Sequence, residues 1–398
     1  MAKSSLTGKA NYNYVLQFAF LAIVCFLVHP ATAQVKVGAE KMDEYLPMLA
    51  GKRIGLVANQ TSLVKTAHLL DTLLSRGIKV TKVFTLEHGF RGSADAGEKV
   101  ESSFDSKTGV KMVSLYGKDK KPKAEELKDI DCIVYDVQDV GARFYTYISS
   151  LHYIMEAVAE SKKKLLILDR PNPNGYYVDG PILDMKHHSF VGMHPVPVVH
   201  GMTIGEYAHM INGEGWLANK IKADIKVITC ARYTHTTKYQ LPVKPSPNLP
   251  NMQAVYLYPS LCMFEGTNVS VGRGTDYPFQ VFGSPDLEGF DYAFVPKSKE
   301  GAKFPPHKDQ NCYGVDLRKF DMRYINQLNI DWLMNAYEAS TNKGAFFTDF
   351  FKLLSGTDSF KNQIVSGISE DVIRASWKPG LDTFKLKRKK YLLYADFE

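Results

Sequence analysis

The chain has 398 residues, 45% of them hydrophobic and 23% charged, and its formal net charge at pH 7 is +7. Charged side chains are spread along the sequence, apart from one basic run, KLKRKK, at residues 385–390. Because the apolar residues 391–394 (YLLY) follow it, this run reads as the solvated edge of a terminal strand. We therefore expect no nucleic-acid partner.

The first 33 residues show the three parts of a secretory signal peptide. Lys3 and Lys9 form a basic region, residues 14–28 an apolar region, and residues 31–33 (ATA) a cleavage site before Gln34. The apolar run is shorter than the roughly 20 residues that span a bilayer. We expect cleavage, no membrane anchor afterwards, and a secreted, periplasmic protein.

Removal of those 33 residues from 398 leaves 365, more than the roughly 250 to 300 at which single cores divide. Two domains are expected, at residues 38–240 and 241–398. Four cysteines remain, none of them in a CxxC pair, and a chain of this size does not need disulfides to fold. Cys132 and Cys230 lie in apolar runs, where a free cysteine behaves as a small buried hydrophobe.

Residues 53–231 alternate between short β-rich runs and helical periodicity. This alternation predicts an α/β domain with a mostly parallel sheet covered by helices on both faces. The predicted strands are 54–58, 80–86, 112–115, 132–137, 165–169, 196–199 and 225–229. The predicted helices are 67–76, 146–162 and 203–216.

The pattern changes after residue 232. Five prolines between residues 241 and 259 predict an ordered connection without regular structure. Beyond it we predict a smaller α+β domain with a helix near 331–339 and a final strand at 391–394.

Polar side chains follow four of the predicted strands, at residues 59–62, 87–89, 136–139 and 169–172. Ligands of parallel sheets bind outside the carboxyl ends of the strands. Any single polar strand end is ordinary loop chemistry, but four together predict a polar site at one edge of the sheet.

Several kinds of chemistry are excluded by missing motifs. The first predicted strand is followed by NQTS and not by G-x-G-x-x-G, which predicts that no nucleotide cofactor is bound. A nucleophilic serine would need a G-x-S-x-G turn, which is absent, and a catalytic cysteine would need an exposed, activated thiol. Carboxylates, arginines, amides and aromatic rings remain, and these are typical of a carbohydrate site.

Four histidines, His187, His188, His194 and His200, lie close together in the sequence. Their spacings match no metal-chelating motif, and intervening prolines prevent a common helical face, so no metal is predicted. Thr203 and Glu206, just downstream, have the spacing of a helix capping box, which predicts a structural role for Glu206.

Glycosidic cleavage uses a carboxylic acid that protonates the leaving oxygen and a second group that stabilises or attacks the anomeric carbon. Glu87 suits the first role, because a carboxyl group just past a buried strand is held rigidly. Glu265 is the candidate for the second role, with Asp136 and Asp139 as competitors. Glu265 could equally cap nearby amides in a turn, and an N-acetyl sugar could supply its own acetamido oxygen.

Arginine and aromatic side chains near the strand ends complete the predicted site. An arginine could grip an acidic substituent of the sugar through two parallel hydrogen bonds, or could instead pair with a nearby aspartate. A tyrosine ring could stack on the sugar. The substrate-binding candidates are Asn59, Gln60, His88, Asp136, Gln138, Arg143, Tyr145, Arg170, Asn268 and Arg273.

The chain resembles a known family over residues 38–394. The motifs that carry the resemblance are NQTS (59–62), LEHGFRG (86–92), DAGE (95–98), SLYG (114–117), DVQDVGARFYTY (136–147), DRPNP (169–173), EGTN (265–268) and GRGT (272–275). Together they look like the exo-β-N-acetylmuramidases of the NamZ type, long known as a domain of unknown function.

The resemblance implies a Rossmann-like domain without a nucleotide, a smaller C-terminal domain, and an active-site cleft between them. It implies removal of terminal N-acetylmuramic acid from the non-reducing ends of peptidoglycan fragments, with disaccharides or muropeptides as substrates and Glu87 as a catalytic residue. The lactyl carboxylate of muramic acid would explain the arginines. A non-catalytic cell-wall sugar-binding protein and an N-acetylglucosaminidase remain the alternatives.

Overall fold

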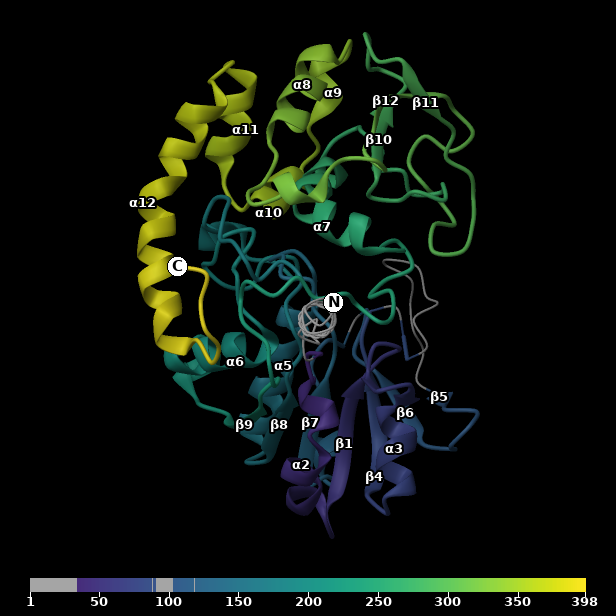
Figure 1. Ribbon diagram of the computed structural model, residues 1–398, viewed down its shortest axis with the longest axis vertical. Coiled ribbons are helices and arrows are strands. Elements are labelled where there is room, and N and C mark those ends of the chain that lie inside the picture. The colour runs from purple at the N-terminus through teal and green to yellow at the C-terminus, as the bar shows by residue number, and fades with distance from the viewer. Residues whose placement is uncertain (1–33, 88, 91–102, 118) are drawn as a thin grey trace, which may run out of the picture. The chain divides into compact units, whose positions relative to one another are not determined.

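Seven strands form one mostly parallel sheet in the N-terminal domain, in the lower part of Figure 1. The structure, a computed structural model, describes residues 34–87, 89–90, 103–117 and 119–398, so the predicted signal peptide lies outside the described residues. The strands run in the order β5-β6-β4-β1-β7-β8-β9, and only β5 is antiparallel to its neighbour. They are β1 (Arg53–Ala58), β4 (Lys79–Thr85), β5 (Ser103–Phe104), β6 (Lys111–Ser114), β7 (Cys132–Asp136), β8 (Lys164–Leu168) and β9 (Asp224–Ile228).

Counted along the chain, the six parallel strands have the order 3-2-1-4-5-6 of a Rossmann fold. The order reverses between β1 and β7, so a nucleotide would bind beside the carboxyl ends of these two strands. Position 59–62, where glycines would admit a pyrophosphate, is instead a tight polar turn. Ser62 donates a hydrogen bond to the backbone oxygen of Asp136 and accepts one from the amide of Asn59.

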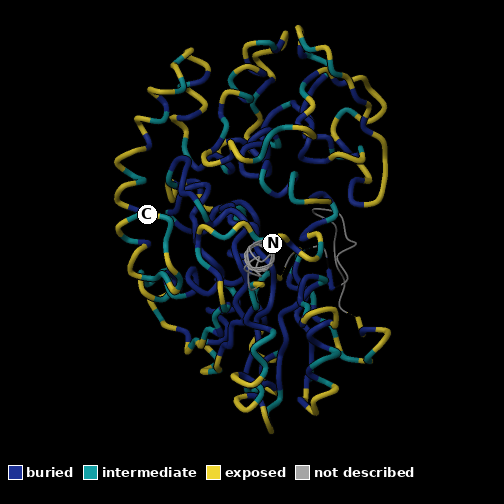
Figure 2. Tube along the Cα trace, in the orientation of Figure 1, coloured by how far each residue is buried: buried dark blue, intermediate teal, exposed yellow. Residues whose placement is uncertain are grey.

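Alternating residues of the central strands enter two hydrophobic layers, because successive side chains of a strand point to opposite faces. In β7, Cys132 and Val134 pack with one layer, whereas Ile133 and Tyr135 pack with the other. Figure 2 shows these strands as mostly buried, and β7 is buried along its whole length. Helices α2 (Met42–Leu49) and α3 (Leu69–Ser75) cover the first face, and α4 (Ala124–Leu127), α5 (Tyr147–Glu160) and α6 (Ile204–Gly213) cover the second.

Six of the seven predicted strands and all three predicted helices of this domain are confirmed within a few residues. The prediction of a strand at 196–199 is wrong. Pro195 and Pro197 lack the N–H groups that a ladder needs, and Val199 forms only isolated bridges, to Ala142 and Asp179. A short hairpin also pairs β2 (Leu63–Val64) with β3 (Ala67–His68).

The smaller C-terminal domain, in the upper part of Figure 1, has a three-stranded antiparallel sheet and several helices. The proline-rich connection is partly helical, because α7 begins inside it and contains Pro259. The helix expected near 331–339 is confirmed as α8. The elements are α7 (Met252–Leu261), β10 (Val281–Ser284), β11 (Tyr292–Phe294), β12 (Cys312–Asp316), α8 (Asp331–Ala339), α9 (Lys343–Phe346), α10 (Phe351–Ser355), α11 (Asp358–Val365) and α12 (Glu370–Arg388).

The predicted final strand at 391–394 is wrong, since these residues follow α12 through the short 3₁₀ helix η6 (Lys389–Tyr391). The basic run at 385–390 is therefore the end of a helix. There the positive side chains lie next to the partial negative charge of the helix C-terminus, which they stabilise.

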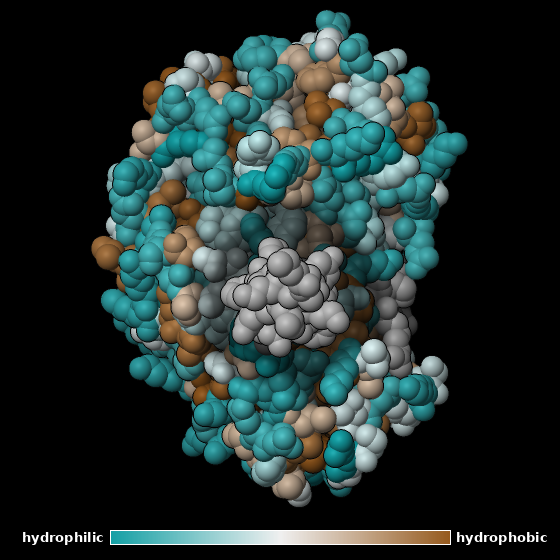
Figure 3. Space-filling view, in the orientation of Figure 1, coloured by the Kyte–Doolittle hydropathy of each residue, from teal (hydrophilic) through white to brown (hydrophobic). Residues whose placement is uncertain are grey.

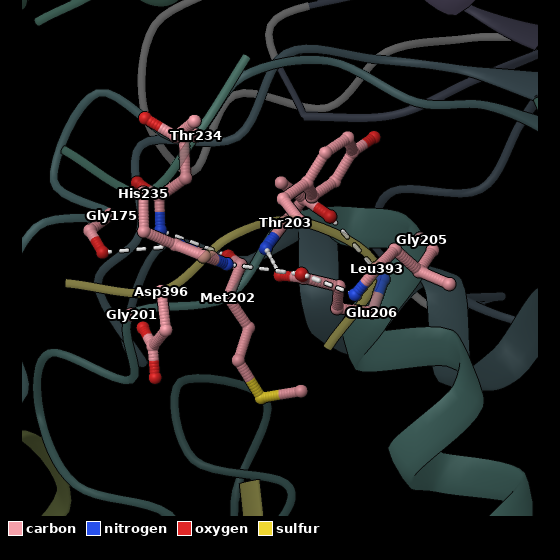
Figure 4. Close-up of polar contacts among 12 residues, drawn as sticks. Gly175, Gly201, Met202, Thr203, Gly205, Glu206, Thr234, His235, Leu393 and Asp396 are labelled. Carbon is pink, nitrogen blue, oxygen red and sulfur yellow. Dashed lines mark hydrogen bonds and ion pairs between the residues drawn. The ribbon is translucent and has the colours of Figure 1, made fainter. Parts of the chain in front are cut away.

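The last residues of the chain are bound to the N-terminal domain by buried polar contacts (Figure 4). Glu206 forms the predicted capping box with Thr203 and also accepts hydrogen bonds from the ring of His235, at 3.0 Å, and the backbone amide of Leu393, at 2.8 Å. The Tyr394 hydroxyl donates to Asp169, a buried carboxyl group that also accepts from Thr203 and the Gly205 amide.

Hydrophilic side chains predominate on the face shown in Figure 3, where hydrophobic ones occur in scattered groups. Among the described residues, no helix combines the length and the apolar character needed to cross a bilayer. One hydrophobic layer continues from α5 and α6 into the C-terminal helices, and residues 36–398 form one compact unit.

Candidate active site

A cavity of about 810 Å³ lies where loops at the carboxyl ends of β4, β6 and β7 meet the C-terminal domain. Four of the predicted site residues line it, namely Glu87, Tyr145, Glu265 and Arg273. The two carboxylates expected from glycosidase chemistry thus face one space although 178 positions separate them in the sequence. The other lining residues include Tyr116, Thr146, Phe190, Asn248, Tyr258, Cys262, Phe279, Lys303, Phe304 and Phe350.

Glu87 follows β4 and is held by two hydroxyl groups. The Tyr116 hydroxyl lies 3.0 Å from its Oε1, and the Thr146 hydroxyl donates to its Oε2 at 2.7 Å. Hydroxyl groups can donate to a carboxylate or accept from a carboxylic acid. The side chain of Glu87 can therefore keep its position in both of the protonation states through which a general acid passes.

Thr146 is the residue that precedes the first turn of α5, where a threonine hydroxyl commonly accepts a hydrogen bond from the helix's own backbone. No such capping bond is present at this helix end. The hydroxyl group instead bonds to Glu87. A departure from a local rule of this kind is expected at functional sites.

Glu265 lies in the 3₁₀ helix η4 (Cys262–Gly266) and forms an ion pair with Arg273. The Nε of Arg273 lies 2.5 Å from Oε1 of Glu265, and the Cys262 thiol lies 3.5 Å from Oε2. Among the described residues, Nε is the one group of this guanidinium that has a protein hydrogen-bond partner. The two Nη groups of Arg273 are therefore available to a ligand.

Cys262 is a free, buried cysteine in the cavity wall. The other three described cysteines are also free and buried, but they lie elsewhere in the fold. Burial and, to a smaller extent, the neighbouring Glu265 carboxylate raise the pKa of the Cys262 thiol well above its usual value. Only a thiolate is an effective nucleophile, so this residue is chemically inert at neutral pH.

Arg143 and Arg170, two of the three predicted substrate-binding arginines, do not line the cavity. Arg170 forms a buried bidentate ion pair with Asp136, with contacts of 2.6 and 2.9 Å, which is the alternative role considered for it. Arg143 is fully buried and donates to four backbone carbonyls, which belong to Pro181, Val196, Leu354 and Ser355. Both arginines join segments of the fold, and Asp136 is likewise enclosed.

The predicted amide ligands also lie outside the cavity wall, where they connect neighbouring segments. Asn59 donates to the Tyr147 hydroxyl, Gln60 to the carbonyls of Lys244 and Pro245, Gln138 to those of Asp139 and Pro171, and Asn268 to Asp286. Tyr145 lines the cavity with its ring, and its hydroxyl donates to Pro245. His88 lies outside the described residues.

Tyr116 and Thr146 were missed as site residues, although both belong to motifs of the family resemblance. Tyr116 lies two residues past β6, which pairs with β4 in parallel. Adjacent parallel strands bring their carboxyl ends together, so a hydroxyl two residues past β6 could have been paired with the carboxylate two residues past β4.

Among the described residues, no group of three or more histidine, cysteine, aspartate and glutamate side chains is arranged to hold a metal ion. His194, one of the four clustered histidines, stacks on Trp216 with ring centres 4.6 Å apart, and hydrogen-bonds to His152 and Tyr207. This histidine belongs to the protein core.

Asp139 was the other competitor for the second catalytic role and is buried outside the cavity wall. Its Oδ2 accepts a hydrogen bond from the Gly141 amide at 2.6 Å, whereas Oδ1 has no partner among the described residues. Burial raises the pKa of Asp139 to about 7. The protonated carboxyl group is thus the form that the fold favours.

Replacing Asp139 by asparagine should make the stability of the protein less dependent on pH. Protonated Asp139 is favoured in the folded state, so its contribution to the unfolding free energy is fully present below the unfolded-state pKa of roughly 3.9. That contribution is lost as the pH rises to the folded-state pKa of about 7. Asp139→Asn does not ionise, so its unfolding free energy relative to wild type should rise by up to about 4 kcal/mol between pH 4 and pH 8. Urea unfolding at both pH values measures this difference. The exposed-site variant Asp349→Asn is the control, and an equal gap at both pH values would contradict the assignment.

Two carboxylates, a guanidinium and several aromatic rings around one cavity fit an enzyme of the glycosidase class. The N-terminal and C-terminal family models of exo-beta-N-acetylmuramidase NamZ match residues 54–253 and 256–394. The chain belongs to the exo-β-N-acetylmuramidase NamZ family, which confirms the resemblance seen in the sequence.

Relatives support the same conclusion. Peptidoglycan beta-N-acetylmuramidase NamZ of Bacillus subtilis (strain 168) is 37% identical over 385 residues, which are 91% of this chain and 92% of that protein. Two crystal structures of DUF1343 family proteins from Bacteroides fragilis NCTC 9343 have the same fold. One has a TM-score of 0.86 at 49% identity over 92% of this chain and 100% of that one. The other has a TM-score of 0.77 at 28% identity over 90% and 99%.

Proposed function

We propose that this protein is an exo-acting glycoside hydrolase that releases terminal β-linked N-acetylmuramic acid from the non-reducing ends of peptidoglycan fragments. The observation that supports it most is the position of Glu87, which lines a cavity of about 810 Å³ that a second carboxylate, Glu265, also lines. The activity in the name of the Bacillus subtilis relative supports the choice of sugar.

In this proposal Glu87 is the general acid. It gives its proton to the glycosidic oxygen as the bond to the anomeric carbon breaks, so the second sugar leaves as a neutral alcohol. Tyr116 and Thr146 hold the carboxyl group toward the cavity through their hydroxyls. A water molecule then completes hydrolysis at the anomeric carbon and returns a proton to Glu87.

The second catalytic group is either Glu265 or the acetamido oxygen of the substrate. The ion pair with Arg273 neutralises Glu265, which weakens it as a nucleophile but leaves it able to accept a hydrogen bond. We therefore favour attack by the acetamido oxygen on the anomeric carbon, with Glu265 orienting the acetamido group. Glu265 as the direct nucleophile is the second possibility.

Arg273 is proposed to recognise the lactyl carboxylate that distinguishes muramic acid from glucosamine. Its two Nη groups can form the parallel pair of hydrogen bonds that a guanidinium makes with a carboxylate. Arg273→Met should lower kcat/KM for a chromogenic β-N-acetylmuraminide by at least roughly 10- to 100-fold more than for the matching N-acetylglucosaminide, because even one of the two charged hydrogen bonds contributes about 1.5–3 kcal/mol.

The ratio of kcat/KM for the two substrates separates loss of lactyl recognition from an effect on Glu265. Glu265 loses its ion-pair partner Arg273 in this variant, and that loss should affect both sugars equally. Lys303→Met is the matched control, because Lys303 is the other cation among the described residues that line the cavity. If the ratio of kcat/KM changed in Lys303→Met but not in Arg273→Met, Lys303 and not Arg273 would be the residue that recognises the lactyl carboxylate.

The function itself is tested with a β-1,4-linked disaccharide that has N-acetylmuramic acid at its non-reducing end. Release of free N-acetylmuramic acid, identified by mass spectrometry, is the expected result. A binding protein would release nothing, and an N-acetylglucosaminidase would instead cleave the analogue without the lactyl group.

Export to the periplasm is part of the proposal, since peptidoglycan fragments arise outside the cytoplasm. It is supported by the signal-peptide pattern of residues 1–33. N-terminal sequencing of the exported protein should find Gln34 as its first residue, whereas an intact Met1 would contradict export by cleavage.

A further inference from the structure

Phe304 combines two properties that rarely occur together in a folded protein. Its side chain is 92% exposed, and it nevertheless lines the cavity that contains Glu87 and Glu265. Burying a phenylalanine side chain stabilises a fold by roughly 1.5–3 kcal/mol, and at this exposure Phe304 contributes almost none of that. A reason for an aromatic ring at this position has to be sought outside folding.

The backbone around Phe304 is held on both sides. Lys299 and Ala302 exchange two backbone hydrogen bonds, and Asn248 donates from Nδ2 to the carbonyl of Gly301 at 2.7 Å. On the other side Pro305 is buried and packs so closely on Gly274 that a Cβ there would lie 2.7 Å from its Cγ. The exposed ring is thus presented by a fixed segment.

The groups that line the cavity differ in how far they are exposed to solvent. Glu87, Glu265 and Arg273, the charged groups of the proposed chemistry, are partly enclosed. Phe304 and Phe350, which is 40% exposed, are the lining aromatic rings that are most open to solvent. Phe304, Phe350 and the exposed Lys303 therefore mark the side on which a ligand emerges from the cavity into solvent.

We propose that Phe304 is the platform on which the leaving-group sugar stacks, that is, the N-acetylglucosamine on the far side of the bond being cleaved. This inference rests on the proposed function. The terminal sugar must lie beside Glu87, so the rest of the glycan leads outward past the exposed rings. One face of a pyranose presents C–H groups, which pack on an aromatic face as other apolar groups do.

The size of the cavity fits this assignment. Pockets of roughly 300–1,000 Å³ enclose drug-sized ligands, and a volume of about 810 Å³ leaves room for part of a second ring beside the terminal one. Phe304 then contributes to substrate choice, because it favours glycans over compounds with a small leaving group.

The test compares Phe304→Ala with wild type on two ligands. One is the disaccharide substrate, which would cover both sugar positions, and the other is free N-acetylmuramic acid, a competitive inhibitor that would occupy only the position beside Glu87. Loss of one stacking contact of about 1 kcal/mol or slightly more should raise KM for the disaccharide roughly five- to tenfold. The inhibition constant of free N-acetylmuramic acid should stay within twofold of wild type.

Phe304→Trp should keep KM within about twofold, because it preserves an aromatic face. Tyr324→Ala removes another strongly solvent-exposed ring, 72% exposed in η5 (Met322–Tyr324) and outside the cavity wall, and should change neither constant. Because Phe304 buries little surface, thermal unfolding of Phe304→Ala should match wild type.

If Phe304→Ala left KM for the disaccharide unchanged, or raised that KM and the inhibition constant of free N-acetylmuramic acid equally, Phe304 would not be the stacking platform. The proposed function would still stand. Failure of the wild-type protein to release any N-acetylmuramic acid would instead overturn the proposed function and this inference with it.

Discussion

Glu87→Gln should lower kcat on the disaccharide by roughly 10²- to 10⁴-fold, which is the usual contribution of a general acid. Glutamine has nearly the same shape as glutamate but no acidic proton to give to the leaving oxygen. The amide can still accept a hydrogen bond from Tyr116 and donate one to Thr146, the two present partners of Glu87. The variant should therefore fold like wild type, which thermal unfolding checks.

The leaving group makes this prediction specific to acid catalysis. A dinitrophenyl glycoside needs little protonation to depart, so Glu87→Gln should lose far less activity on it than on the disaccharide. An equal loss on both substrates would show that Glu87 acts at another step, and near wild-type turnover of the disaccharide would remove it from the mechanism altogether.

Glu265→Gln, measured in parallel, discriminates between the two proposed second groups. If the acetamido oxygen is the nucleophile, the variant should keep partial activity and form no covalent intermediate with the enzyme. If Glu265 attacks directly, activity should fall as far as in Glu87→Gln.

Arg143→Met should destabilise the fold by roughly 3–5 kcal/mol and leave the kinetics of the folded enzyme nearly unchanged. The guanidinium now satisfies four buried carbonyl oxygens, two of them in the N-terminal domain and two, those of Leu354 and Ser355, in α10. A buried acceptor left without a partner costs about 1–3 kcal/mol. Part of this loss is offset, because burial lowers the pKa of Arg143 to about 9 and so already disfavours its charge.

Urea unfolding measures the change in stability. Arg323→Met is the matched control, because that arginine is 87% exposed and its ion pair with Asp321 should contribute less than about 1 kcal/mol. A stable Arg143→Met variant with a raised KM would contradict the structural role and restore the predicted contact with substrate.

The six parallel strands of the N-terminal sheet could be predicted from the sequence because their signal is local. Each central strand is a short apolar run followed by polar residues, and both properties can be read without knowledge of the rest of the chain. Helix α12 shows where this fails. Its buried residues Ile373, Trp377 and Phe384 follow a helical period, but Pro379 and Gly380 interrupt the pattern in a way that normally ends a helix.

The residues of the candidate site also differ in whether local sequence could predict their roles. Glu87 could be predicted because its position after a strand is a property of a few neighbouring residues. The partners of Arg143 could not, because Leu354 and Ser355 lie 211 and 212 positions away and contribute only backbone oxygen, which every residue has. Sequence identifies which side chains are able to bind a ligand, whereas only the fold decides whether other protein groups already occupy them.

The contacts that residues 393–396 form with earlier parts of the chain determine when folding can be completed. Leu393, Tyr394 and Asp396 supply buried partners for Glu206, Asp169 and Arg388, and the carbonyl of Ala395 accepts from the amide of His235. During synthesis, these four contacts cannot form before residues 393–396 have been made, although Glu206, Asp169 and Arg388 also have partners earlier in the chain. Folding of the N-terminal domain is therefore completed only after the C-terminal domain has been synthesised, in spite of the early place of the N-terminal domain in the sequence. Removal of residues 393–398 should destabilise the N-terminal domain, because Glu206, Asp169 and His235 each lose one partner.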